Sequence, residues 1–162
     1  MPARVWSDPQ EKTYDDFQLG DVVVTRGRTI DAGDLAVFSG LTGDHYPLHT
    51  DEEFAKTTRF GTRIAHGPLT FALAVGLVGM SGFYGNAITA LVEIRSLRAL
   101  KPVIPGDTVL VHAEVVELSA GNNPKYGTLH VNYSVRNQRK EEVMVFLQIM
   151  LARRRLQSGA GT

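Results

Sequence analysis

Residues 67–80 read GPLTFALAVGLVGM, and this apolar stretch decides which folds the chain can adopt. Pro68 suits the first turn of a helix, because proline lacks an N–H that would be unpaired there anyway. Apolar side chains fall on nearly every face of the stretch, which predicts a buried helix about 20 Å long. The segment is too short to cross a bilayer, which takes roughly 20 residues.

The chain after this helix has the pattern of an antiparallel sheet. Val109, Val111, Ala113 and Val115 alternate with polar residues, as expected for strands with one buried face. Turn signals rich in glycine, proline and asparagine separate four predicted strands, at 88–100, 108–118, 129–135 and 143–152. The order predicts an α+β fold, in which a curled antiparallel sheet wraps one buried helix. Such a sheet leaves strand edges that small domains often cover by dimerisation.

The chain before this helix is predicted to hold one strand and two short helices. The strand covers 22–29. The first helix begins at the cap residue Asp31 and ends by Gly43. The second is indicated by Thr50-x-x-Glu53, the pattern of a capping box.

Length and composition place the chain among ordinary globular proteins. A chain of 162 residues suits a single domain, 1–162, with a core at about 15–152, an arm at 1–13 and a loose tail at 156–162. The absence of cysteine excludes disulfides, cysteine-ligated zinc, iron–sulfur clusters and a cysteine nucleophile.

The charge balance and the N-terminal sequence indicate which classes of partner and which location to expect. The 17 basic and 17 acidic residues cancel, whereas a general nucleic-acid binder needs a basic face. The N-terminal residues contain no apolar segment of the kind found in signal peptides. We therefore expect a cytoplasmic protein with no nucleic-acid or membrane partner.

Candidate catalytic groups gather between residues 39 and 67. Asp44 and His49 flank Pro47, and a rigid loop of this kind can aim a carboxylate and an imidazole at one water as an acid/base pair. Gly67 stands at the predicted helix start, where a backbone N–H can stabilise an oxyanion. A surface loop and a plain capping glycine are the alternatives. The histidines of this region lack a recognisable ligand spacing, so no metal is expected.

Four motifs in this chain resemble one known family. GDHYPLH at 43–49, FG at 60–61, IAHG at 64–67 and the run LKPVIPGDT at 100–108 resemble the MaoC-like (R)-specific enoyl-CoA hydratases/dehydratases. The resemblance covers about residues 15–152. It implies a hotdog fold, in which the sheet wraps a long central helix at 67–80, with overhanging helices at about 31–42 and 51–57.

The resemblance also implies an activity, a lyase of acyl-CoA metabolism. Asp44 and His49 would hold the catalytic water, and the Gly67 N–H would bind the thioester oxygen. The reaction would be reversible hydration of trans-2-enoyl-CoA to (R)-3-hydroxyacyl-CoA. No cofactor is implied, because coenzyme A is part of the substrate. The working unit would be a homodimer or a dimer-based homo-oligomer.

A second set of residues is assigned to substrate binding. Tyr46 stands where the family has asparagine, and it either braces the loop or narrows the acyl pocket. Pro47 stiffens the same loop, and His66 bonds the loop before the helix rather than transferring a proton. Arg63 could meet CoA phosphates and Phe71 could line the acyl pocket, with solvated charge and core packing as the respective alternatives.

Two other functions remain open on the sequence. A hotdog acyl-CoA thioesterase would share the ligand but direct water at the carbonyl carbon. An inactive subunit that binds CoA esters would explain the tyrosine at position 46. The hydratase pattern of the loop favours the lyase over both.

Overall fold

A six-stranded antiparallel sheet forms the body of the molecule in a computed structural model that describes residues 7–155. Its main path runs β1-β4-β5-β6-β3, and β2 pairs with β4 beside β1. The strands are β1 Val22–Val24, β2 Arg28–Thr29, β3 Ile88–Ala99, β4 Thr108–Ser119, β5 Tyr126–Arg136 and β6 Glu142–Arg153. The predicted antiparallel strands of the second half are therefore confirmed, with bounds that differ by one to three residues.

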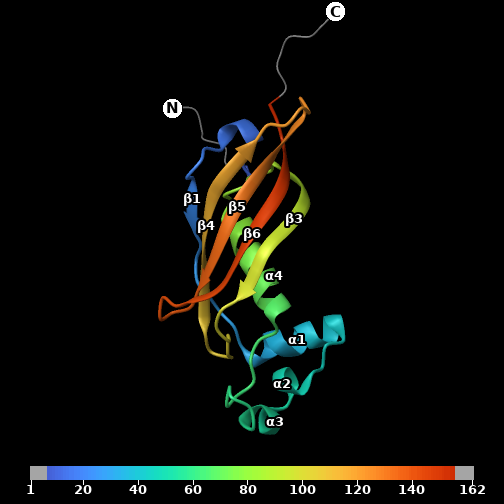
Figure 1. The fold of residues 1–162 in the computed structure, drawn as a ribbon, viewed down its shortest axis with the longest axis vertical. Helices are drawn as coiled ribbons and strands as arrows, with labels where there is room; N and C mark the ends of the chain where they lie inside the picture. The colour runs from blue at the N-terminus through green and yellow to red at the C-terminus, as the bar shows by residue number, and fades with distance from the viewer. Residues whose placement is uncertain (1–6, 156–162) are drawn as a thin grey trace, which may run out of the picture.

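One long helix packs against this sheet, and three short ones project from one end (Figure 1). The long helix is α4, Gly67–Gly79, which begins after the cap residue His66 and has Pro68 in its first turn. The short helices are α1 Ala32–Thr42, α2 Pro47–Thr50 and α3 Glu52–Lys56, and a 3-10 turn covers Tyr14–Asp16. The predicted α+β arrangement of a sheet curled around one helix is confirmed.

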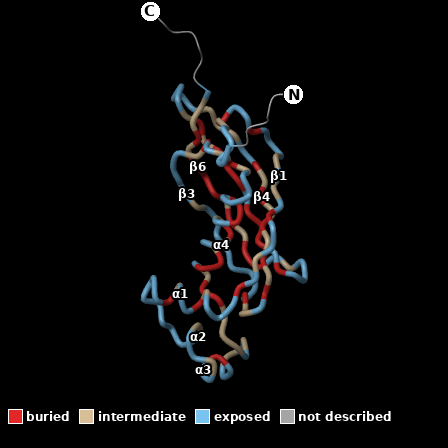
Figure 2. Tube along the Cα trace, turned by 180° about the vertical axis from the view of Figure 1, so that it is seen from behind, coloured by how far each residue is buried: buried red, intermediate tan, exposed pale blue. Residues whose placement is uncertain are grey.

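The core lies between α4 and the sheet, whereas α1 to α3 are mostly exposed (Figure 2). Val111, Ala113 and Val115 of β4 are fully buried, as their alternation predicts. Tyr133 stacks on Phe146 of β6 with ring centroids 4.5 Å apart. Its hydroxyl is paired in the core, and burial raises the pKa of Tyr133 to about 12.

The predicted strand at 22–29 is wrong in the middle. Thr25 turns its hydroxyl into the sheet, where Oγ1 accepts from the backbone N–H of Val111 at 3.0 Å. Gly27 then passes so close to β4 that a Cβ there would lie 3.0 Å from a methyl of Thr108. The Thr25 side chain therefore takes the place of a backbone acceptor in the pairing with β4, and the strand splits into β1 and β2.

The predicted capping box at Thr50 is also wrong. Asp51 caps α3 instead, because its side chain accepts from the Phe54 N–H at 3.0 Å. Thr50 ends a separate short helix, α2, which the sequence reading did not include. By contrast, Asp31 caps α1 through the expected box with Asp34, and Gly43 ends it.

The central helix is not buried all round, contrary to its composition. Leu69, Ala74 and Leu77 face the core, but Pro68, Ala72, Gly76 and Gly79 form an exposed row. The sheet of one chain covers only one side of α4. Burial within one chain therefore does not explain why the exposed side of α4 is apolar, whereas contact with a second molecule would explain it.

Two further predictions concern a membrane-spanning helix and the ends of the chain. No helix within residues 7–155 combines the length and apolar character that crossing a bilayer requires. The predicted tail at 156–162 and the first six residues of the predicted arm lie outside the described residues. The remainder of the arm is bonded to the body, since the Asn86 N–H donates to the Gln10 carbonyl at 3.0 Å.

Candidate active site

The first element of the site is the tight loop that carries Asp44. Helix α1 ends at Gly43, whose φ of 76° lies in the left-handed region that glycine adopts without strain. The chain then turns back, and Oδ1 of Asp44 accepts from the Tyr46 N–H at 3.2 Å. The carboxylate is exposed, so its remaining acceptor positions face open space.

The second element is His49, which lies on α2 and is half-buried. Its Nδ1 lies 2.7 Å from the carbonyl oxygen of Ile64. A carbonyl only accepts, so the ring proton of neutral His49 sits on Nδ1 and the lone pair on Nε2. The backbone bond therefore leaves Nε2 ready to accept a proton.

The third element is His66, the residue before α4, which is only 1% exposed. Its ring stacks on that of His49 with centroids 3.8 Å apart and planes 28° apart. Polar atoms of Asp44, His49 and His66 all lie within 4.8 Å of one another. Residues separated by 22 positions in the chain thus meet at one point.

Three such groups raise the question of a metal ion, which the spacing along the chain did not suggest. Imidazole lone pairs lie in the ring plane, and an ion must lie near the plane of each ring that binds it. Near-parallel stacked rings do not share such a position. The stacking therefore disfavours an ion held by all three residues at once.

Gly67 lies on a cavity of about 200 Å³ next to this cluster. The cavity is mostly apolar and is bounded by Phe60, Ile64, Leu100 and Met144, with Arg59 among its lining residues. A Cβ added to Gly67 would meet no atom within 4 Å. The N–H groups of a first helical turn have no partner inside the helix, so this one can face a ligand oxygen.

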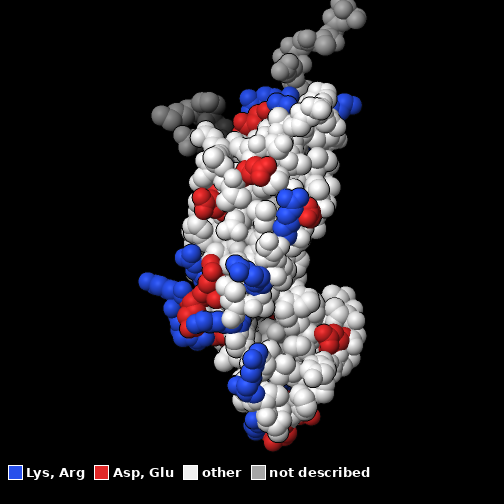
Figure 3. Space-filling model, viewed as in Figure 1, with Lys and Arg blue, Asp and Glu red and all other residues white. Residues whose placement is uncertain are grey.

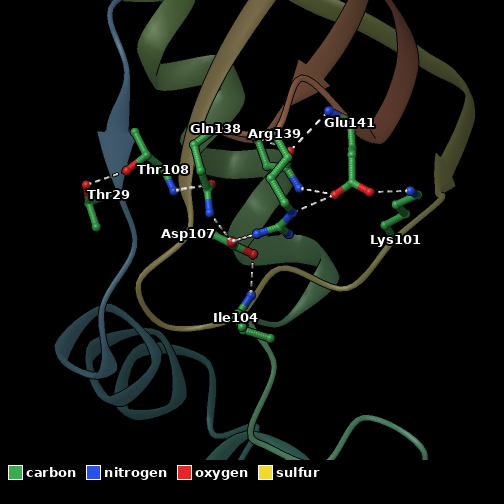
Figure 4. Close-up of polar contacts among 9 residues, drawn as sticks. Thr29, Lys101, Ile104, Asp107, Thr108, Gln138, Arg139 and Glu141 are labelled. Carbon is green, nitrogen blue, oxygen red and sulfur yellow. Dashed lines mark hydrogen bonds and ion pairs between the residues drawn. The ribbon is translucent and has the colours of Figure 1, made fainter.

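A network of hydrogen bonds and ion pairs around the buried carboxylate of Asp107 lies behind the loop that lines this cavity, and Figure 4 shows its polar contacts. Asp107 is 2% exposed and accepts from the Ile104 N–H, from Gln138 Nε2 and from Arg139 Nη1, at 3.1, 2.7 and 3.2 Å. These bonds join the loop after β3 to the hairpin between β5 and β6. In the same loop, the carbonyl of Val103 accepts from the Ala65 N–H at 2.7 Å. The hairpin therefore holds the segment that leads into His66 and Gly67.

The remaining predicted site residues take varied positions. Tyr46 is 57% exposed and lies edge-on to His49 with centroids 6.3 Å apart, while Pro47 begins α2 beside it. Arg63 pairs with Glu52 at 3.1 Å, and hydrogen bonds from Thr62 and Arg63 hold the pKa of the Glu52 carboxyl below its usual value. Phe71 packs on a ring of the sheet. Of this set, Tyr46 and Pro47 lie at the cluster, while Arg63 and Phe71 are engaged elsewhere.

Sequence reasoning missed two contributors. Ser39 on α1 is buried and its Oγ lies 3.3 Å from Nε2 of His66. The second contributor is Ile64, whose backbone carbonyl accepts the hydrogen bond from Nδ1 of His49. A serine on the core-facing side of α1 could have been recognised in the sequence as a candidate hydrogen-bond partner. The bond from His49 to a backbone carbonyl could not, because any residue type supplies a carbonyl.

Charge on the face shown in Figure 3 is mixed, with basic and acidic side chains interspersed over the sheet and helices. Large areas between them are uncharged. Several basic side chains gather over the lower left and centre of this face, although the chain as a whole has zero net charge.

Comparison with protein families matches residues 16–137 to the MaoC like domain. This match covers most of the chain and includes Asp44, His49, His66 and Gly67. The chain belongs to the MaoC-like domain family. The motifs quoted from the sequence thus identified the right family.

Two relatives within the MaoC-like family match this chain at 35% and 38% identity over the aligned residues. An (R)-specific enoyl-CoA hydratase of Rhodospirillum rubrum is 38% identical over 110 residues, which is 65% of this chain and 70% of the relative. Protein MaoC of Klebsiella aerogenes is 35% identical over 103 residues, or 64% of this chain. The match spans only 30% of that longer protein.

Solved structures confirm the hotdog fold. The monoamine oxidase regulatory protein from Archaeoglobus superposes with a TM-score of 0.85 at 36% identity, covering 90% of this chain and 96% of that one. A Mycobacterium tuberculosis protein described as a double hotdog superposes with a TM-score of 0.79 over 93% of this chain and 46% of that one, at 21% identity. The fold is therefore that of the MaoC-like proteins.

Proposed function

We propose that the protein catalyses the reversible hydration of trans-2-enoyl-CoA thioesters to (R)-3-hydroxyacyl-CoA. One observation carries the proposal: the Ile64 carbonyl bonds Nδ1 of His49, which leaves the lone pair on Nε2, and His49 shares with the Asp44 carboxylate a cluster whose polar atoms lie within 4.8 Å of one another. A fixed base next to a carboxylate is what activation of one water requires. Relatives named as enoyl-CoA hydratases and a 3-hydroxybutyryl-CoA dehydratase support the same reaction class.

The chemistry follows from the positions of these groups. His49 Nε2 takes a proton from a water that Asp44 also holds, and the water oxygen forms a bond to C3. The electron pair of the C2=C3 bond moves toward the thioester oxygen, where the Gly67 N–H stabilises the developing negative charge. The Asp44–His49 pair returns the proton to C2. The reaction is redox-neutral, and it needs no cofactor beyond the coenzyme A of the substrate.

We further propose that the working unit is a homodimer joined along β3. This strand has 12 residues and pairs only with β6 within the described chain. Leu91 and Val92 are 57% and 54% exposed on it, so part of this open edge is apolar, beside an exposed ion pair of Glu93 with Arg95. Ala99 and Leu100 at its end also line the cavity, so a second copy would complete the wall.

The test is a turnover panel of short, medium, branched and dicarboxylic enoyl-CoA esters. The assay follows loss of the conjugated enoyl-thioester absorbance together with release of free CoA. We expect loss of absorbance without free CoA. Release of CoA would instead indicate a thioesterase, and binding without turnover would indicate the inactive subunit.

Variants connect this activity to the site. Asp44→Asn and His49→Ala should each lower kcat by about 100- to 10,000-fold, the usual contribution of acid/base catalysis. His45→Ala is the matched control, because it removes an exposed imidazole from the same loop and should leave kcat unchanged. Full activity in either of the first two variants would exclude the proposed mechanism.

A further inference from the structure

His66 is buried at the centre of the site, yet the proposed hydration gives it no step. Its Nε2 lies 3.1 Å from the main-chain oxygen of Asp44 and 3.3 Å from Oγ of Ser39. Its ring stacks on His49. The ring thus contacts both members of the acid/base pair from the protein side.

Hydrogen-bond chemistry fixes the tautomer of this ring. A carbonyl oxygen is only an acceptor, so a nitrogen 3.1 Å from the Asp44 oxygen carries the proton. With the lone pair on Nε2, two acceptors would face each other. Nδ1 is buried with no partner among the described residues, and a proton there would have no acceptor. The ring is therefore the Nε2–H tautomer, the opposite of His49.

We propose that His66 is a positioning residue that sets the geometry of the Asp44–His49 pair, an inference that rests on the proposed function. The loop that carries Asp44 is exposed, and the bonds of Asp44 to Tyr46 and Thr42 are local. The bond from His66 ties the backbone of that loop to the buried cap residue that precedes the central helix. Stacking on the same ring restricts the imidazole plane of His49.

Three substitutions separate the two contacts. His66→Gln keeps an N–H donor near the position of Nε2 but removes the ring. His66→Phe keeps a flat ring that can stack but leaves the Asp44 carbonyl without its donor. His66→Ala removes both. We expect kcat to fall about 100-fold in His66→Ala, the cost of displacing catalytic groups by about 1 Å, with KM changed less than about threefold.

The two single-contact variants should then lie between His66→Ala and the native protein. If the hydrogen bond to Asp44 matters, His66→Gln recovers part of the lost kcat; if the stack matters, His66→Phe recovers part. A kcat in His66→Ala close to the native value would overturn the proposal. Failure of both Gln and Phe to recover any activity would overturn it as well.

A control separates positioning from general loss of stability. Leu77→Ala creates a cavity in the core on the same helix, 8% exposed and away from the cluster, and should lower Tm without lowering kcat. If Leu77→Ala lowers kcat as much as His66→Ala at equal Tm, the role of His66 is only structural.

A spectroscopic measurement on the native protein tests the tautomers without depending on whether a variant folds. The ¹⁵N chemical shifts of the five histidines, measured on the native protein, should show one Nε2–H ring for His66 and one Nδ1–H ring for His49. A protonated Nδ1 on His66 would contradict the proposal. Because this result does not depend on substrate, it remains valid even if no enoyl-CoA is hydrated, so failure of the inference and failure of the proposed function are distinguishable.

Discussion

At the scale of single residues, Gly67 offers the sharpest separation of folding from chemistry. It opens α4 and lines the cavity, and a Cβ there would meet no atom within 4 Å. The added methyl group would instead project into the space in which the thioester oxygen is proposed to bind. Its effect should therefore fall on the substrate and not on the fold.

We accordingly predict that Gly67→Ala leaves Tm unchanged or slightly higher, since alanine is the better helix former by about 0.5–1 kcal/mol. Its kcat/KM should fall about 10- to 100-fold, because the substrate carbonyl is displaced. Thermal unfolding and steady-state kinetics on one preparation test both parts. Undiminished kcat/KM would show that the carbonyl does not approach this glycine.

At the scale of elements, the end of α1 determines where Asp44 is placed. Gly43 has a φ of 76°, whereas Gly40 lies within the helix and is exposed. An alanine adds a methyl to open space at either position. The two glycines therefore differ in backbone conformation alone, and they form a matched pair.

Gly43→Ala should destabilise the protein by about 1–2 kcal/mol, the cost of a left-handed conformation for a residue with a Cβ. It should also lower kcat, because it disturbs the turn that aims Asp44. Gly40→Ala should stabilise by about 0.5–1 kcal/mol and leave kcat unchanged. Urea denaturation with parallel kinetics checks both, and equal stabilities in the two variants would count against this account.

The hairpin between β5 and β6 predicts a pH dependence of stability. Hydrogen bonds from Asn137, Lys101 and Arg139 lower the pKa of the Glu141 carboxyl to about 2 from its usual 4.5. A carboxyl with a lowered folded pKa stabilises fully above its unfolded pKa and loses that contribution as protons bind. The Glu141 contribution should therefore be complete above about pH 4.5 and disappear as the pH falls toward 2.

Glu141→Gln should remove this part of the pH dependence. The native protein should lose more stability than the variant between pH 4.5 and 2, and the two curves should run parallel above pH 5. Denaturant melts across this range measure the difference. Identical slopes in the acidic range would mean that the network is too well solvated to affect stability.

At the scale of the whole molecule, two features leave apolar surface uncovered. Leu91 and Val92 lie on β3, whose edge away from β6 pairs with no strand among residues 7–155, and α4 keeps an exposed row of small residues. In a single chain both surfaces face water, which is unfavourable for apolar groups. A second molecule that covers them would remove this cost. Both features agree with the proposed dimer.

Leu91→Lys should therefore convert a dimer into a monomer of 17.7 kDa without unfolding it, because the side chain is 57% exposed in the single chain. Val116→Lys, 40% exposed on the interior strand β4, is the control that should stay dimeric. Sedimentation velocity distinguishes the two masses. A native protein that sediments at 17.7 kDa would exclude the dimer.

Local sequence determined most of the elements. Alternation located β4 and β5 to within a few residues, since side chains of a strand point to opposite faces in turn, and continuous runs between turn signals located β3 and β6. The Asp31 capping box and Gly43 set the ends of α1 through bonds between residues close in the chain. The motif residues Asp44, His49 and Gly67 could be named as candidates because their side-chain types and local spacing suit the chemistry.

Only the tertiary structure decided how those residues meet. The contact of His66 with Asp44, the carbonyl of Ile64 on His49 and the split of the first strand at Thr25 each join segments that are distant in sequence. The exposed side of α4 is equally invisible to composition, because burial depends on how far one sheet can wrap. Local patterns fix backbone conformation, whereas tautomers, cavities and uncovered surfaces depend on which distant groups come into contact.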